Sequence, residues 1–172
     1  YTFRRNTLEK GTAMNHLFTA PKTAAQQLRD TLLGVLIGLA RATTSEPKTV
    51  NTDEVLNAGL RLAAQPDAPA EKLQRMLDIA RTEKQAVAPN CATCAMPCGN
   101  TNDYDLARLW NAPPAVRALK VRLLSAVCTL AAQRPDADAQ YAIYQGLFTL
   151  AEDWDEELLL PVVQHAEELC RR

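Results

Sequence analysis

The sequence predicts an all-α protein with about six main helices. Residues that favour helices, such as Ala, Leu, Gln, Glu and Arg, are abundant, whereas the 172 residues include only 6 glycines and 5% aromatic residues. Apolar residues recur at helical spacing over long segments, and proline-containing stretches separate these segments. Together these observations predict an up-down bundle built from two similar three-helix units that a cysteine-rich loop joins.

The first three-helix unit is predicted at residues 21–88. Its apolar repeat places the first helix at about residues 23–43. Thr52 and Asp53 offer side-chain oxygens that could cap the second helix, and the third helix is expected to reach about residue 87.

The cysteine loop and a short helix or turn are predicted at residues 89–112, and the second three-helix unit at residues 113–172. Asp155 is expected to cap the last helix, which Pro161 is expected to strain or kink. The larger aromatic side chains are interpreted as core or helix-packing residues, namely Trp110, Tyr141, Tyr144, Phe148 and Trp154.

The two units resemble each other in sequence. Leu32-Leu33 with Leu39-Ala40 matches Leu123-Leu124 with Leu130-Ala131, and Gly59-Leu60 matches Gly146-Leu147. An internal duplication is one hypothesis, and a coincidence of helical periodicity is the other. Both units belong to one expected domain, residues 21–172. An N-terminal segment of residues 1–20 precedes it, and residues 1–13 are expected to be upstream sequence or an addition to the natural chain.

Charge and hydropathy argue against two classes of partner. The 19 basic and 20 acidic residues are interspersed, so no field of one sign is available to bind nucleic acid. The longest uncharged apolar run, Thr31–Ala40, is about half of what a membrane-spanning helix needs. No membrane association is expected. A cytoplasmic location is expected because no export signal is recognised.

Three closely spaced cysteines form the most unusual motif. Cys91, Cys94 and Cys98 have the pattern C-x2-C-x3-C within the stretch NCATCAMPCGNTNDYD. Thiolates at this spacing can ligate one zinc ion or an iron-sulfur cluster, which predicts a metal or cluster site. Two alternatives stay open: a thiol/disulfide pair, and a structural or vestigial loop.

A closed metal site of this kind normally needs a fourth ligand. The candidates are Cys128, His165, Asp103 and Asp105, with Cys170 or a group from a partner as further options. Each has a simpler interpretation. Cys128 lies on an apolar helix stripe, His165 is expected to be partly exposed, and the two aspartates could cap the short helix that follows the loop.

The helical segments resemble a known family. The stretches Leu28–Ala40 (LRDTLLGVLIGLA), Thr49–Leu56 (TVNTDEVL) with Ala58-Gly-Leu, and Asp138–Phe148 (DAQYAIYQGLF) resemble the helical domain of the hybrid cluster proteins, also called prismane or hydroxylamine reductase proteins. The resemblance implies a stand-alone relative of that helical domain. Proteins of the family are several times longer, carry their cubane cysteines at the N-terminus and build the hybrid cluster in α/β domains. Their reductase chemistry and catalytic residues are therefore not carried over.

Two functional hypotheses follow. The first is a metal- or iron-sulfur-associated redox accessory protein that acts with a protein or redox partner. The second is a metal-free helical interaction module whose cysteine loop is structural or a reversible disulfide, and a homodimer is compatible with either. No catalytic constellation is visible, so an enzyme, oxidoreductase-related if any, is the least favoured hypothesis.

Overall fold

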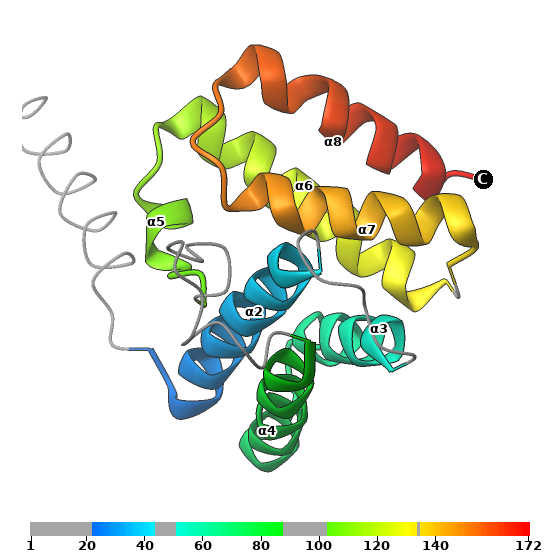
Figure 1. Ribbon diagram of the computed structural model, residues 1–172. Helices are drawn as coiled ribbons and strands as arrows, with labels where there is room; N and C mark the ends of the chain where they lie inside the picture. The colour runs from blue at the N-terminus through cyan, green and yellow to red at the C-terminus, as the bar shows by residue number, and fades with distance from the viewer. Residues whose placement is uncertain (1–21, 44–50, 88–102, 134) are drawn as a thin grey trace, which may run out of the picture.

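The computed structural model describes residues 22–43, 51–87, 103–133 and 135–172, and the regular structure in these ranges is entirely helical. This confirms the predicted all-α class. The helices are shown in Figure 1: α2 (Ala24–Ala42), α3 (Thr52–Ala63), α4 (Ala70–Val87), α5 (Ala107–Trp110), α6 (Pro114–Ala132), α7 (Ala137–Leu150) and α8 (Glu156–Cys170).

Side-chain caps fix where several helices begin. Thr23 accepts a hydrogen bond from the Gln26 amide at the start of α2, and the Gln26 side chain accepts one from the Thr23 amide in return. Asp136 caps α7, and Asp155 caps α8 through the Leu158 amide at 3.1 Å, as predicted. Pro161 lies in the second turn of α8, which continues through it to Cys170.

The predicted cap of α3 is wrong. The helix starts at Thr52 itself, and its N-cap residue is Asn51, which makes no side-chain cap hydrogen bond. The Thr52 hydroxyl instead donates to Glu83 of α4 at 2.8 Å, and Asp53 accepts from the Tyr144 hydroxyl of α7 at 2.6 Å. The side chains predicted to cap α3 therefore form hydrogen bonds with residues of other helices instead.

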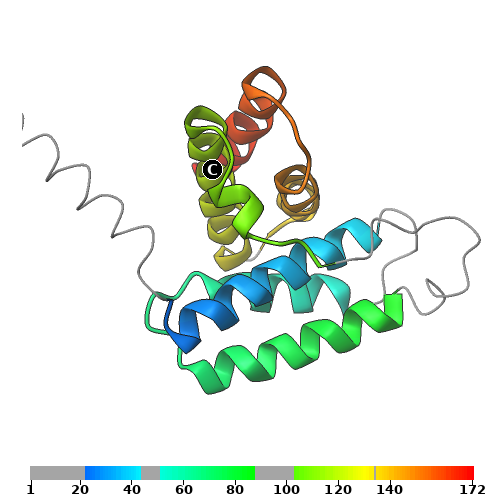
Figure 2. The same cartoon turned by 90° about the vertical axis from the view of Figure 1, so that its left-hand side faces the viewer.

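The helices pack in two groups, as Figures 1 and 2 show from two sides. Helices α2, α3 and α4 contact one another and are called the N-terminal group here; α6, α7 and α8 contact one another and are called the C-terminal group. The groups meet where α3 contacts α6 and where α2 contacts α7. One continuous core runs through both, so the described helices form a single packed body.

Polar pairs add to the contact between the groups. Asn57 of α3 donates to Gln140 of α7 at 2.8 Å, and the Asp53–Tyr144 hydrogen bond lies on the same pair of helices. The pKa of Tyr144 is raised, first because the hydroxyl is buried and then because it donates to Asp53. These hydrogen bonds fix the register of α3 against α7.

Two of the aromatic residues predicted to pack in the core are exposed. Tyr141 is 68% exposed and Trp110 is 41% exposed. Tyr144 and Trp154 pack against the core while remaining partly accessible, and Phe148 lies under the guanidinium group of Arg41. The prediction fails for Tyr141 because its position lies on the solvent-exposed side of α7.

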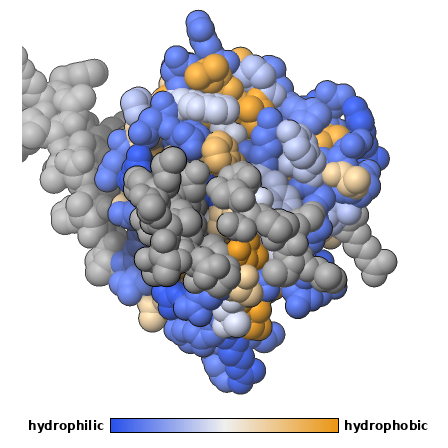
Figure 3. All heavy atoms as spheres, in the orientation of Figure 1, coloured by the Kyte–Doolittle hydropathy of each residue, from blue (hydrophilic) through white to orange (hydrophobic). Residues whose placement is uncertain are grey.

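The outer surface is mixed. On the face seen in Figure 3, hydrophilic residues cover most of the described surface, and hydrophobic residues reach it in separate patches. Among the helices that the structure describes, none combines the length and apolar character that a membrane crossing requires.

Candidate functional site

The predicted cysteine ligands Cys91, Cys94 and Cys98 lie outside the described residues. Their convergence on a metal therefore stays a prediction. The structure does describe both ends of the segment that contains them, since α4 ends at Val87 and the description resumes at Asp103.

Two interactions attach the chain after this segment to the N-terminal group. Lys84 of α4 forms an ion pair with Asp103, and the Tyr104 amide donates to the Gly34 carbonyl of α2 at 3.0 Å. A Cβ atom at Gly34 would lie only 2.2 Å from the Tyr104 carbonyl oxygen, so the chain can cross α2 here only because residue 34 is glycine. We call this contact the Gly34 crossing.

The two aspartates proposed as a fourth ligand have other partners. Asp105 accepts a hydrogen bond from the Ala107 amide at 3.0 Å, which is the local capping role considered for it. Asp103 carries the ion pair with Lys84. Both carboxylates are thus occupied in organising the chain that leads into α5.

The two described thiols are protonated at neutral pH. Burial raises the pKa of Cys128 from its ordinary value of 9.0 to about 11. Burial also raises the pKa of Cys170, whose sulfur donates to the Ala126 carbonyl at 3.4 Å. Cys128 also packs against the hydrophobic core, the simpler role considered for it.

His165 is exposed on α8. In Figures 1 and 2, α8 lies on the opposite side of the molecule from α4, whose end leads into the cysteine segment. Within residues 22–43, 51–87, 103–133 and 135–172, no three His, Cys, Asp or Glu side chains gather where they could hold a metal ion. Each candidate fourth ligand was an alternative, and its distance from Cys91, Cys94 and Cys98 stays outside the described residues.

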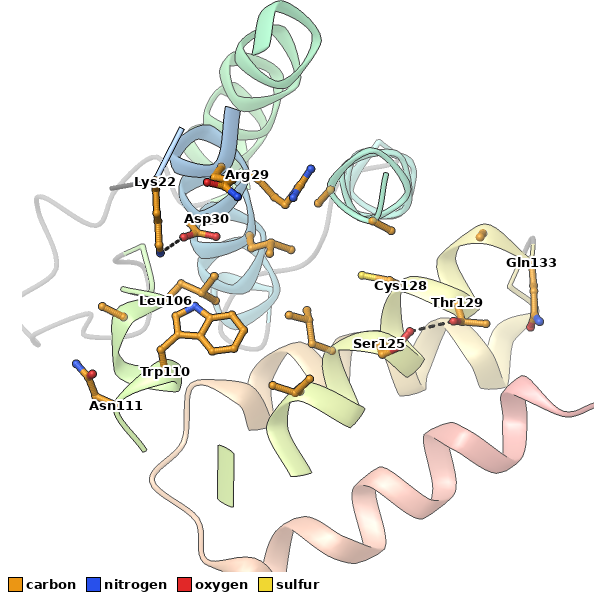
Figure 4. A pocket seen from close by; sticks show the side chains of 18 residues that line it. Lys22, Arg29, Asp30, Leu106, Trp110, Asn111, Ser125, Cys128, Thr129 and Gln133 are labelled. Atoms are coloured by element: carbon orange, nitrogen blue, oxygen red, sulfur yellow. Dashed lines mark hydrogen bonds and ion pairs between the residues drawn. The ribbon is translucent and has the colours of Figure 1, made fainter. Parts of the chain in front are cut away.

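Sequence reasoning missed a large pocket between α2, α5 and α6. Its volume is about 1020 Å³, at the upper end of the range of about 300–1,000 Å³ that is usual for small-molecule pockets. Figure 4 shows the indole of Trp110 pointing from α5 into the space between α2 and α6. We call this cavity the α2/α6 pocket.

The lining of the α2/α6 pocket is largely apolar in its middle. The side chains there come from three helices or the turns beside them: Leu33, Leu106, Trp110, Val121, Leu124 and Cys128. Trp110 and Val121 are 41% and 38% exposed, so part of this apolar surface meets solvent. Ser125 and Thr129 of α6 add hydroxyl groups, and Thr129 donates to the Ser125 carbonyl.

The charged residues of the pocket come from α2 and the residues just before it. Lys22 forms an ion pair with Asp30, which Figure 4 shows beside Arg29. Arg29 donates to the carbonyls of Gln65 and Pro66 at 2.8 and 3.0 Å. Its Nε atom is buried and has no hydrogen-bond partner among the described residues.

A buried lysine lies elsewhere in the C-terminal group. Lys120 is 3% exposed and donates to the carbonyls of Leu150 and Glu152 at 3.1 and 2.9 Å. Burial lowers its pKa. The ammonium group satisfies carbonyls at the end of α7, so we assign Lys120 a structural role.

Comparison with known proteins identifies no relative. The chain matches no protein-family model, no curated protein and no solved structure.

Proposed function

We propose that this protein is a helical binding module whose α2/α6 pocket takes up the apolar part of a ligand. The observation that carries the proposal is the pocket itself, a cavity of about 1020 Å³ with an apolar middle and charged groups on its α2 side. Binding pockets for small molecules combine these features: apolar walls supply affinity, and a few polar groups orient the ligand.

The pocket lies between equivalent helices of the duplication that we propose. The sequence match of Leu32-Leu33 with Leu123-Leu124 makes α2 the counterpart of α6. Leu33 and Leu124 both line the pocket, as do Asp30 and its counterpart Val121.

Glycine packing also supports two similar three-helix units. A Cβ atom on Gly59 would meet the side chain of Leu36, and one on Gly146 would meet Val127, the residue that the same alignment pairs with Leu36. The equivalent glycine in each group thus packs on the equivalent residue of its neighbouring helix.

Binding of an uncharged dye tests the pocket. Nile red fluoresces when it enters an apolar site, and we expect it to bind the native protein with a stoichiometry of one. Ser125→Phe should abolish the binding, because residue 125 is exposed and lines the pocket, so a large side chain fills the space without entering the core. Ser125→Ala, which leaves the pocket open, should bind like the native protein. Equal dye binding by both variants would contradict the proposal.

A second candidate function is a metal or iron-sulfur site at Cys91, Cys94 and Cys98, in a redox accessory protein that resembles the helical domain of hybrid cluster proteins. The observation that favours it is the attachment of the following residues by the Lys84–Asp103 ion pair and the Gly34 crossing. A loop that starts and ends on a rigid scaffold places its ligands at lower entropic cost.

Anaerobic purification followed by absorption spectroscopy and metal analysis tests the second function. We expect visible iron-sulfur bands or stoichiometric zinc, and loss of either in Cys91→Ala with Cys94→Ala. A colourless, metal-free protein whose thermal stability survives both substitutions would exclude this function. In that protein, a thiol titration that reveals one readily oxidised pair would favour the reversible disulfide.

A further inference from the structure

We propose that the α2/α6 pocket is selective for an organic monoanion with an apolar chain, such as a medium-chain carboxylate. This inference rests on the proposed binding function and adds the chemical class of the ligand. Two sets of observations support it: the charges on the pocket wall and the separation of those charges from the apolar surface.

The charged residues of the lining leave one net positive charge. Lys22, Arg29 and Asp30 are the charged residues among those that line the pocket, two of them cationic and one anionic. Asp30 is already paired with Lys22. A ligand carboxylate would therefore face one uncompensated cation, whereas a cationic head group would be repelled by the same wall.

Arg29 is the cation with unused donor capacity. One of its terminal nitrogens donates to both the Gln65 and Pro66 carbonyls, which holds the side chain in place. Its buried Nε has no partner in the part of the chain that the structure describes. Its second terminal nitrogen also makes no hydrogen bond in the described part of the chain and, unlike Nε, is not buried, so it can donate to an incoming carboxylate.

The apolar surface begins beside these charges and extends toward α6. In Figure 4, Lys22, Arg29 and Asp30 lie on the α2 side, Leu106 and Trp110 follow, and Cys128 and Thr129 lie on α6. A ligand whose head group meets α2 would direct its chain past the Trp110 indole toward Leu124 and Cys128. The thiol of Cys128 is protonated at neutral pH and belongs to the apolar surface.

Three probes of equal chain length test the charge preference: dodecanoate, dodecanol and dodecyltrimethylammonium, each below its micelle concentration. Trp110 reports binding through its fluorescence in a Trp154→Phe background, which removes the other tryptophan. We expect dodecanoate to bind at least tenfold more tightly than dodecyltrimethylammonium, with dodecanol between them.

Variants locate the head group. Lys22→Gln should weaken dodecanoate about fivefold and leave dodecanol unchanged, since it removes a half-exposed cation. Arg29→Gln should weaken dodecanoate more than tenfold, and its melting temperature shows whether the fold survives the lost carbonyl contacts. Lys72→Gln is the matched control, because Lys72 is an exposed lysine of α4 that does not line the pocket.

The possible results separate the two proposals. Equal affinity for all three probes, or a loss of dodecanol binding as large as that of dodecanoate in Lys22→Gln, overturns the charge preference and leaves the binding module in place. Failure of all three probes and of Nile red to bind overturns both. Tight binding of dodecanoate that Ser125→Phe does not affect places the ligand elsewhere and also overturns the inference.

Discussion

The N-terminal and C-terminal helix groups differ at the positions of α2 and α6 that the proposed duplication aligns. Gly34 of α2 is covered by the backbone of Tyr104 at the Gly34 crossing, whereas Ser125 of α6, which the proposed duplication pairs with Gly34, is exposed and lines the α2/α6 pocket. The two groups otherwise share their contact scheme, since each has three helices that all contact one another. One face therefore holds the chain at Tyr104, and the other lines the pocket.

The strongest test of this comparison is to place the same side chain, valine, at both positions. Gly34→Val should destabilise the protein by about 4 kcal/mol, because a Cβ atom 2.2 Å from a backbone oxygen forces the Tyr104 chain away from α2. Ser125→Val should change stability by less than about 0.5 kcal/mol, as is usual for exposed positions. Urea denaturation measures the loss of stability in each variant. Similar losses in the two variants would show that the Gly34 crossing contributes little to stability.

The pH dependence of stability sharpens the comparison at Cys128, which lies three residues after Ser125 on α6 and lines the same pocket. Cys128 has a pKa of about 11 in the folded protein against 9.0 when unfolded. Above pH 9 the unfolded chain loses this proton first, so stability is fully present below pH 9 and falls by about 2 kcal/mol as the pH rises to 11.

Urea denaturation of the native protein and Cys128→Ala at pH 8, 9, 10 and 11 checks this expectation. The difference in the free energy of unfolding between the native protein and Cys128→Ala should shrink or change sign as the pH rises. Tyr104 and Tyr144 are present in both proteins, and burial also raises their pKa values. Taking the difference in unfolding free energy between the two proteins removes the pH dependence that these tyrosines contribute. A gap that stays constant up to pH 11 would show that the thiol is hydrated.

The paired glycines test how closely the two groups correspond. Gly146→Ala places a Cβ atom 2.5 Å from Val127 Cγ2, and Gly59→Ala places one 2.8 Å from Leu36 Cδ1. Valine is fixed at χ1 while leucine can move its end, so we expect Gly146→Ala to cost about 2 kcal/mol and Gly59→Ala about 1 kcal/mol.

A second substitution serves as the control for this pair. Val127→Ala should be destabilising alone but should suppress the cost of Gly146→Ala, because it removes the methyl group that the new Cβ atom meets. Additive costs in the thermal denaturation of the double variant would show that the clash is relieved elsewhere.

The smallest expected loss of stability comes from a hydrogen bond between the two helix groups. Tyr144→Phe removes the hydrogen bond to Asp53 and should cost about 1 kcal/mol. Tyr141→Phe is the matched control, since Tyr141 is exposed on the same helix and should give no measurable change in melting temperature. Equal melting temperatures for both variants would remove this hydrogen bond from the account of how the groups are held together.

The helices could be predicted from the sequence because their apolar spacing is local information. The predicted helix at residues 23–43 corresponds to α2 (Ala24–Ala42), and the Asp155 cap was found as expected. Thr52 and Asp53 show the limit of this reasoning. Their side chains find Glu83 and Tyr144, partners 31 and 91 residues away along the chain, and no local pattern reveals such partners.

The pocket was less predictable for a similar reason. Leu33, Trp110 and Leu124 each suit a packed core, and only their arrangement on three separate helices leaves space between them. The one available signal is Trp110, a large aromatic residue three positions before the Pro113-Pro114 pair at the start of α6, and the sequence interpretation assigns it to the core. The cysteine motif can be recognised in the sequence because its three cysteines are close together along the chain. Its fourth ligand cannot be recognised in this way, because that depends on the tertiary structure.

The Gly34 crossing has a consequence for protein engineering. The Lys84–Asp103 ion pair and the Tyr104–Gly34 hydrogen bond hold the chain after residue 102 against α4 and α2. A flexible peptide placed between Val87 and Asp103, in place of residues 88–102, would therefore start and end at fixed points, and doubling its length would cost only about 0.6 kcal/mol in closure entropy. The helical body can thus serve as a scaffold into which foreign peptides are inserted in place of this segment, with the helices acting as a rigid display frame.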